Sequence, residues 1–331
     1  MQLDVYFVLT PRFLMLDLSG PAEAFAYAVR HGAPFRVHCV SPTPTVRNAL
    51  GLSVGDLEPL PDALPPGALV FLTGVMGAAT GYENPESRAV VAWLRRVLTP
   101  QQRLACVCSA ALLAGEAGLL DGRQCTTHHS LTGRLRELAP RAEVLEDRVF
   151  VEDGAVCTSA GVTTGIDLAL HLIERHAGAV TAQTVARELV VWQRRTSNDP
   201  QISPWLAFRN HLHPSVHRVQ DALSRAPERP WPLEELARLA HTSVRNLTRL
   251  FREQTGTTIV DYQQRIRAAQ ARQLLEDPRM SVEQVAERVG FGSARALRRV
   301  FVQVYGAPPR ARRRSAAATL TARTAARRTR V

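Results

Sequence analysis

The sequence has no lysine: all 41 basic residues are arginine, in acidic and basic regions alike, which indicates a coding bias rather than a function. It has no apolar run of about eighteen residues, so we expect no membrane span. The first residues lack a basic segment and a cleavage site, and they predict a strand rather than a signal peptide. The five cysteines are odd in number and unevenly spaced, which argues against a disulfide framework and predicts a reducing, cytoplasmic location.

Charge is unevenly distributed along the 331 residues, a length that predicts two domains. Residues 1–180 contain 14 Arg and 18 Asp or Glu, a net charge of −4. Residues 181–331 contain 27 Arg and 12 Asp or Glu, a net charge of +15, and the two parts sum to +11. The surplus predicts a polyanionic partner for the second part alone, although a solvated basic surface would have the same composition.

Short apolar runs alternate with helical patterns through the first 180 residues. The predicted strands are Leu3–Leu9, Phe35–Val40, Ala68–Leu72, Leu104–Cys108 and Ala155–Thr158. The predicted helices are Pro21–Arg30, Pro85–Leu98, Ala110–Ala117, Leu131–Leu138, Val162–His176 and Thr181–Trp192. Apolar strands separated by helices indicate a mostly parallel sheet covered on both faces. We therefore predict a doubly wound, flavodoxin-like α/β domain at residues 1–190, with ligands bound at the carboxyl ends of its strands.

The second part of the chain has a different pattern. A polar stretch, Arg194–Pro200, ends in proline and predicts a linker, which we place at residues 191–213. From Pro214 onward no strand pattern appears, so residues 214–313 are predicted to form an all-α domain. Residues 310–331 contain eight arginines and no acidic residue, and we expect a basic, disordered tail at 314–331.

An internal repeat with a period of about fifty residues is the strongest signal. Five residues of the first copy, namely Ser243, Leu247, Arg249, Phe251 and Gly256, recur fifty positions later. Ser243 and Ser293 are suitable N-caps, and Ser281 with Gln284 predicts a capping box. The remaining spacing predicts a buried face on each second helix, formed by Leu247, Phe251, Leu297 and Phe301, opposite small residues at Ala237 and Ala286.

Each repeat therefore predicts a helix-turn-helix unit whose second helix turns polar side chains away from its core. Such side chains reach base edges when the helix enters a major groove. The residues predicted to contact DNA are Arg245, Thr248, Arg249, Arg295, Arg298 and Arg299. A plain helical bundle with a basic face is the alternative, and two copies in one basic region favour DNA binding over it.

These residues resemble the AraC-type DNA-binding module across about 214–313. The resemblance rests on the turn Gly290–Ser293, on Phe301, on Gly306 followed by Pro308-Pro309, and on the connecting helix Tyr262–Leu275. It implies that both recognition helices enter successive major grooves of double-stranded DNA. The sequence departs at Ile259, where the first unit usually has proline, which affects a turn rather than the groove-facing residues.

In the first domain, the predicted strand Leu104–Cys108 runs directly into a helix. A cysteine at a helix N-terminus is favoured as thiolate by the helix dipole, so Cys108 is a candidate nucleophile. A buried core cysteine is the alternative. With Asp17, Thr126–His128 and Gly161–Asp167, this region resembles the PfpI/ThiJ-type, glutamine-amidotransferase-like domain over about residues 3–190. In particular it resembles a branch shared by isocyanide hydratases and by regulators that join this domain to an AraC-type module.

The resemblance assigns the hydratase nucleophile and acid/base to Cys108 and Asp17, in a pocket with Gly74, Ser109 and His128. Ser109 stands where that branch usually has Thr, and Leu72-Thr73-Gly74 stands where Pro-Gly-Gly is expected. Ala110 and His129 replace Gly and Trp. Added Cβ atoms at Ala110 and Thr73 would crowd the pocket. We therefore interpret the domain as a non-catalytic sensor of a small-molecule effector. The alternative is a cysteine-dependent hydratase or hydrolase-like enzyme that uses Cys108 and Asp17.

Other expectations concern partners and cofactors. We expect a homodimer through the first domain, from the resemblance only, and no cofactor. Cys106, Cys108 and His128-His129 match no zinc spacing, so we expect no metal. The histidines near the linker, His211, His213 and His217, are expected to be solvated.

Overall fold

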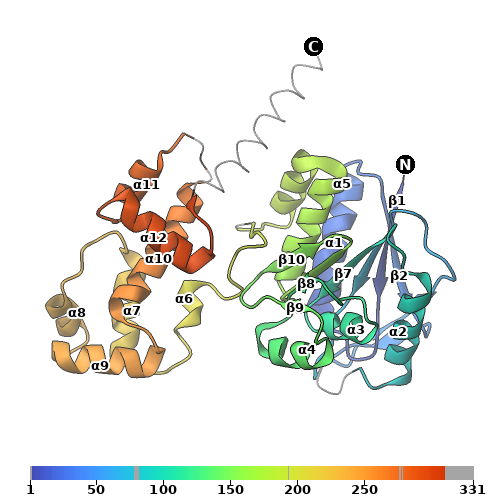
Figure 1. Ribbon diagram of the computed structural model, residues 1–331, viewed down its shortest axis with the longest axis horizontal. Helices are drawn as coiled ribbons and strands as arrows, with labels where there is room; N and C mark the ends of the chain where they lie inside the picture. The colour runs from blue at the N-terminus through green and yellow to red at the C-terminus, as the bar shows by residue number, and fades with distance from the viewer. Residues whose placement is uncertain (1, 78–81, 193, 276, 278, 310–331) are drawn as a thin grey trace, which may run out of the picture. The chain divides into compact units, whose positions relative to one another are not determined.

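The computed structural model describes residues 2–77, 82–192, 194–275, 277 and 279–309 (Figure 1). The chain divides into two compact units between Gln201 and Ile202. In the described residues no helix is both long and apolar enough to cross a bilayer. The predicted tail at 314–331 lies outside the described residues.

The first unit is built on a seven-stranded sheet, which confirms the predicted α/β fold. Its strands in spatial order are β10 (Phe150–Asp153), β11 (Val156–Ser159), β7 (Arg103–Val107), β6 (Leu69–Leu72), β1 (Leu3–Val8), β2 (Phe35–Ser41) and β5 (Glu58–Pro59). Every neighbouring pair is parallel except β10 and β11. The carboxyl ends of β1, β6, β7 and β11 therefore meet at one edge of the sheet.

Helices cover both faces of this sheet (Figure 1). Helices α1 (Met15–Arg30) and α5 (Thr164–Glu188) belong to the core that includes Phe7 and Phe71. The opposite core, which includes Tyr6 and Val70, is covered by helices α2 (Pro85–Val97), α3 (Ala110–Glu116) and α4 (Thr132–Leu138). Because successive strand residues point to opposite faces, each central strand contributes to both cores. This double burial explains the continuous apolar runs in the sequence.

Smaller elements complete the unit. Two-stranded sheets are formed by β3 (Val46–Arg47) with β4 (Ser53–Val54) and by β8 (Gln124–Cys125) with β9 (Glu143–Val144). A short 3-10 helix, η1, spans His129–Leu131. None of these elements, nor β5 or β10, was predicted. All of them except β10 have only two or three residues, which are too few to show a period.

Three predicted helices have clearly different bounds in the structure. Helix α1 begins at Met15 rather than at Pro21, which lies buried inside it. Proline removes one helical hydrogen bond, and here the packing of α1 against α5 offsets that loss. Helix α5 joins the two predicted helices through a kink at Gly178, whose φ of 86° is outside the helical range.

The second unit contains the two predicted helix-turn-helix pairs and the helix that connects them. Its helices are α6 (Pro204–Ala207), α7 (Pro214–Arg225), α8 (Leu233–Leu239), α9 (Val244–Thr255), α10 (Ile259–Leu274), α11 (Val282–Arg288) and α12 (Ala294–Tyr305). Leu247 and Phe251 are buried in the first core, and Leu297 and Phe301 in the second, as predicted. The Ser243 and Ser293 caps and the Ser281–Gln284 capping box are also confirmed.

The connecting helix α10 holds the two pairs together through Arg267. Its guanidinium donates to the carbonyl of Gly290, in the turn of the second pair. It also donates to the carbonyls of Pro227, Glu228 and Arg229, in the loop before the first pair. One side chain thus satisfies backbone acceptors from both pairs.

The turn at Gly290 lies directly against the loop that Arg267 binds. Gly290 has a φ of +81°, and a Cβ built there would lie 2.2 Å from the Glu228 carbonyl oxygen. Two features therefore require glycine at position 290: the left-handed backbone conformation and the close approach of the Glu228 carbonyl. The following Gly292 has no such neighbour within 4 Å.

We predict that Gly290→Ala destabilises the second unit by at least about 2 kcal/mol, because left-handed strain alone costs about 1–2 kcal/mol and the clash adds to it. Gly292→Ala is the matched control and should change stability by much less. Thermal unfolding of the full chain measures both. Equal unfolding curves for the two variants would contradict the contact.

Candidate functional sites

The exposed faces of α9 and α12 carry the six residues predicted to contact DNA. Arg245, Thr248 and Arg249 are exposed on α9, and Arg295 and Arg299 are exposed on α12. Arg298 is half-buried, with 40% of its side chain exposed. All six therefore lie away from the buried Leu and Phe of their own helix.

Intramolecular partners distinguish these side chains. Arg249 donates to both carboxylate oxygens of Glu253 at 2.8 Å and to Asn246 Oδ1 at 2.8 Å. Arg298 forms a 3.0 Å ion pair with Glu283 of the preceding helix. Both pairs are solvent-exposed and therefore weak, so a DNA phosphate or base can replace them at small cost.

The other four residues predicted to contact DNA have no ion pair of this kind within the described part of the chain. The Thr248 hydroxyl donates back to helix carbonyls, those of Val244 and Arg245. Its proton is therefore engaged, while its oxygen and methyl group remain available to a base. Among the described residues, Arg245, Arg295 and Arg299 are exposed and form no ion pair with a carboxylate, a condition they share on these two helices with Arg252.

In the first unit, Cys108 occupies a sharp turn between β7 and α3. Its φ of 60° is left-handed, a conformation that a non-glycine residue adopts at an energetic cost. The turn is tightly enclosed: a Cβ at Gly161 would lie 2.6 Å from Cys108 Sγ, and one at Gly74 would lie 2.7 Å from Cys108 Cβ. Glycines on the two neighbouring strand ends thus permit the approach, and Cys108 is only 5% exposed.

Asp17 lies beside this turn, in the first helical turn of α1. Its side chain is fully buried and accepts hydrogen bonds from the backbone N–H groups of Gly74 at 3.2 Å and Val162 at 2.8 Å. A hydrogen bond also joins it to Cys108. Burial raises its pKa to about 6, and the two backbone donors limit that rise. The structure thus brings Asp17, Gly74 and Cys108 together.

Ser109 connects the turn to the loop after β6. Its Oγ accepts from the Val75 N–H at 2.8 Å and lies 3.2 Å from the Tyr82 hydroxyl. Thr127 approaches from the other side, where its hydroxyl donates to the Cys108 carbonyl at 2.9 Å. Neither Tyr82 nor Thr127 was predicted as a site residue. Thr127 belongs to the Thr126–His128 motif, whereas a lone tyrosine in a loop carries no sequence signal.

The protonation state of Cys108 decides what the site can do. Burial, followed by the charge of Asp17, raises the pKa of its thiol to about 12. We expected the helix N-terminus to favour thiolate, and instead desolvation dominates. At neutral pH the group is a thiol, which is a weak nucleophile.

The other residues considered for the pocket have partners of their own. His128 Nδ1 is bound to Ser130 Oγ at 2.8 Å, and its ring lies 4.3 Å from that of the exposed His129. Ala110 packs in the core that α2 and α3 cover, and the Thr73 hydroxyl donates to the Val8 carbonyl. The close approaches described at Cys108 are those of Gly74 and Gly161.

The cysteines and histidines form no metal centre among the residues that the structure describes. Cys106, Cys125 and Cys157 are buried in the sheet region, where burial raises the pKa of each thiol. His211 is also buried, in contrast to the expected solvation, and the His217 Nε2 donates to the His211 carbonyl at 2.7 Å.

Two family models match the chain. The DJ-1/PfpI family matches residues 4–175, more than half of the sequence, and a helix-turn-helix domain matches residues 236–315. The chain belongs to the DJ-1/PfpI family and carries an AraC-type helix-turn-helix domain. The solved structure of a ThiJ/PfpI family protein from Pseudomonas syringae has the same fold, with a TM-score of 0.52 and 19% identity over 72% of this chain and 89% of that one.

Curated relatives separate the two functions considered for the chain. The HTH-type transcriptional regulator CdhR of Pseudomonas aeruginosa is 31% identical over 316 residues, which are 93% of this chain and 91% of that protein. The isonitrile hydratase of Pseudomonas putida is 31% identical over 190 residues, which are 57% of this chain and 78% of that enzyme. The regulator is similar to this chain over both units, whereas the hydratase is similar over little more than half of it. The chain is a DNA-binding transcription regulator.

We predict that Cys108 of this regulator reacts as a buried thiol. In the native chain, its alkylation by iodoacetamide should accelerate about tenfold per pH unit from pH 7 to 9, as expected below a raised pKa. At pH 7 it should be more than about a hundredfold slower than in the urea-unfolded chain, where the pKa is about 8.5. Mass spectrometry of the Cys108 peptide gives the rates. A fast rate that does not change between pH 6 and 8 would instead reveal a thiolate.

Proposed function

We propose that this cytoplasmic regulator senses a small-molecule effector at the Cys108 site and transmits its state to the DNA-binding unit through residues 194–201. We call these eight residues the strap. They fall within the segment predicted as a linker, yet they are hydrogen-bonded to the first unit. Covalent continuity with the second unit makes them the path along which a change at the site reaches DNA.

Arg195 joins the strap to the loop that follows β11. Its backbone N–H and Nε donate to the two carboxylate oxygens of Asp167, each at 2.8 Å, and Nη2 donates to Thr163 Oγ1 at 2.8 Å. Asp167 is only 4% exposed, so Arg195 neutralises a buried carboxylate. The same loop contains Val162, whose N–H binds Asp17.

Gln201 joins the strap to the other wall of the site. Its side-chain amide donates to the Thr127 carbonyl at 2.9 Å, and the Thr127 hydroxyl binds the Cys108 carbonyl. Asp199 adds a third attachment, since its carbonyl accepts from the Val149 N–H at 2.9 Å. The two ends of the strap thus bind the two loops that enclose Asp17 and Cys108. This double attachment is the observation that carries the proposal.

An effector acts on this arrangement only if it binds the attached and released straps with different affinity. A ligand that competes for the Val162 N–H or displaces Thr127 meets that condition, because each group belongs to a strap-bearing loop. We further propose that two copies of the chain associate through the first unit, so that one effector signal reaches two DNA-binding units. Sedimentation of the full chain tests whether it forms a dimer.

We predict that Arg195→Ala releases the strap, because breaking a pair with a buried carboxylate costs about 3 kcal/mol or more. Amide hydrogen exchange of residues 194–201 should accelerate at least about tenfold. Affinity for a promoter fragment should change by more than about threefold.

Arg194→Ala is the matched control, because Arg194 pairs at 2.8 Å with Glu174, on the surface of α5. It should leave exchange of the strap and DNA affinity near the values of the unaltered protein. A released strap in Arg195→Ala with unchanged DNA affinity would refute the coupling while leaving DNA binding intact.

We propose that Arg245, Arg249, Arg295 and Arg299 read bases, with Thr248 and Arg298 as additional contacts. We predict that Arg249→Ala costs about 1–3 kcal/mol on the matched site and relaxes selectivity at one base pair. A phosphate contact would instead weaken all sequences equally and lower the salt slope by about 0.9.

Fluorescence anisotropy with matched and singly mismatched duplexes at several salt concentrations separates these outcomes. Arg30→Ala is the control, since Arg30 is exposed at the end of α1 in the other unit. Equal losses on every duplex would exclude base reading by Arg249.

A further inference from the structure

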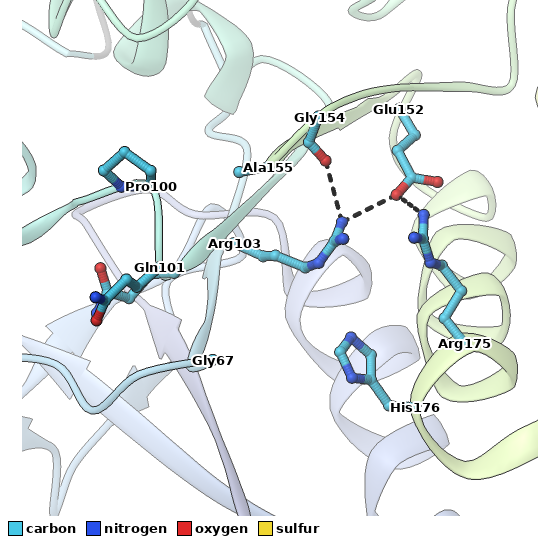
Figure 2. Close-up of a pocket in the computed structure, with 10 residues that line it drawn as sticks. Gly67, Pro100, Gln101, Arg103, Glu152, Gly154, Ala155, Arg175 and His176 are labelled. Atoms are coloured by element: carbon cyan, nitrogen blue, oxygen red, sulfur yellow. Dashed lines mark hydrogen bonds and ion pairs between the residues drawn. The ribbon is translucent and has the colours of Figure 1, made fainter.

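A cavity of about 620 Å³ opens at the amino-terminal edge of the sheet (Figure 2). It is lined by the residues that precede β6 and β7, by the turn between β10 and β11, and by Arg175 and His176 of α5. Volumes of 300–1,000 Å³ are typical of sites for small molecules. The cavity therefore has the capacity for a small metabolite.

This cavity is distinct from the Cys108 site. Arg103, which lines it, is the first residue of β7, whereas Cys108 follows the last residue of that strand. The two sites therefore lie at opposite edges of one parallel sheet, and a ligand in one does not touch the other.

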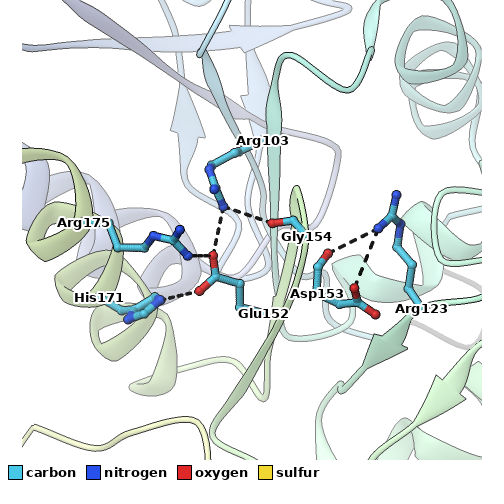
Figure 3. Close-up of polar contacts among 7 residues, drawn as sticks. All are labelled: Arg103, Arg123, Glu152, Asp153, Gly154, His171 and Arg175. Carbon is cyan, nitrogen blue, oxygen red and sulfur yellow. Dashed lines mark hydrogen bonds and ion pairs between the residues drawn. The ribbon is translucent and has the colours of Figure 1, made fainter. Parts of the chain in front are cut away.

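Positive charge converges on one carboxylate at the cavity (Figure 3). Arg103 Nη1 and Arg175 Nη1 both donate to Glu152 Oε1, the first of them at 2.9 Å. His171 Nε2 lies 2.7 Å from Glu152 Oε2, so both oxygens are occupied. Two guanidinium charges against one carboxylate leave a net charge of at least +1.

The guanidinium groups are only partly satisfied by this pairing. Arg103 Nη1 also donates to the Gly154 carbonyl at 3.1 Å, and Arg103 contacts the Cys157 thiol as well. Arg175 reaches Glu152 through one nitrogen, and its side chain is 44% exposed. A guanidinium has five N–H donors, and a bidentate partner uses two of them. Donors of Arg175 therefore remain for a second acceptor.

His176 lies below the two guanidinium groups and points toward the space between them (Figure 2). Burial and the two neighbouring cations lower its pKa, so its ring is neutral at pH 7 and adds a donor without adding charge. Gln102 contributes nothing comparable, since its amide is bonded to the Leu64 and Pro65 carbonyls.

We propose that this cavity binds a small oxyanion, a carboxylate or a phosphate, through Arg175, Arg103 and His176. A second anion beside Glu152 offsets the repulsion between two cations that share one oxygen. The planar donors of arginine match the paired oxygens of both anions. The site gives the regulator a second ligand, independent of the effector proposed for the Cys108 site.

The test is isothermal titration calorimetry of the full chain with sodium succinate and with sodium phosphate, at constant ionic strength set by sodium chloride. We expect saturable binding of at least one anion with a stoichiometry of one per chain. Preference for succinate identifies a carboxylate ligand, and preference for phosphate identifies a phosphorylated one. Arg175→Gln should weaken binding about tenfold to a hundredfold, since it removes charge-assisted hydrogen bonds.

Arg123→Gln is the matched control. Arg123 lies on the same edge of the sheet, where it binds Asp153 rather than Glu152 (Figure 3), and its loss should not affect binding. Glu152→Gln removes the competing carboxylate and should strengthen binding, which a merely structural ion cluster does not predict. The proposal is overturned if neither anion binds below about 50 mM, or if Arg175→Gln and Arg123→Gln bind equally well.

Discussion

Burial of two carboxylates organises the edge of the sheet on which the first unit depends. Asp17 and Asp167 lie in the first turns of α1 and α5, and both are nearly inaccessible to solvent. A buried carboxylate requires donors or a cation, because desolvation strongly disfavours an unpaired charge. Asp17 is satisfied by backbone N–H groups of two loops, and its pKa rises to about 6. Asp167 is satisfied by Arg195, a residue of the strap. Asp17 therefore holds together the two loops beside Cys108, and Asp167 holds the strap to the first unit.

Elements with a strong local signal were predictable from the sequence. Central strands buried on both faces produce apolar runs, and serine caps have local causes, so Ser243 and Ser293 could be interpreted without a structure. Arg195 and Arg267 could not be, because their partners lie 28 and at least 23 residues away in the chain. Their importance comes from tertiary contacts alone.

The protonation state of Cys108 also could not be predicted from the sequence, because it depends on burial. A helix N-terminus favours negative charge by about 0.3–1 kcal/mol at exposed positions, and this effect can be inferred from sequence. Burial acts in the opposite direction, and each pKa unit corresponds to about 1.4 kcal/mol. Because the pKa of the thiol is raised to about 12, the cost of burying the thiolate exceeds the stabilisation that the helix dipole provides. Only the structure reveals the close approach of Gly74 and Gly161 that removes water from the thiol.

The geometry that protonates Cys108 also suits a sensor. A reactive thiolate needs solvent access and a neighbouring cation, whereas this thiol faces a buried carboxylate. The same enclosure makes the loops around it interdependent, since Asp17 binds both the Gly74 and the Val162 backbone. Under the proposed function, a ligand that displaces the Val162 contact disturbs the loop that also bears Thr163, to which Arg195 of the strap donates a hydrogen bond. Under the proposed function, the tight closure that keeps Cys108 protonated is also what couples occupancy of the site to the strap.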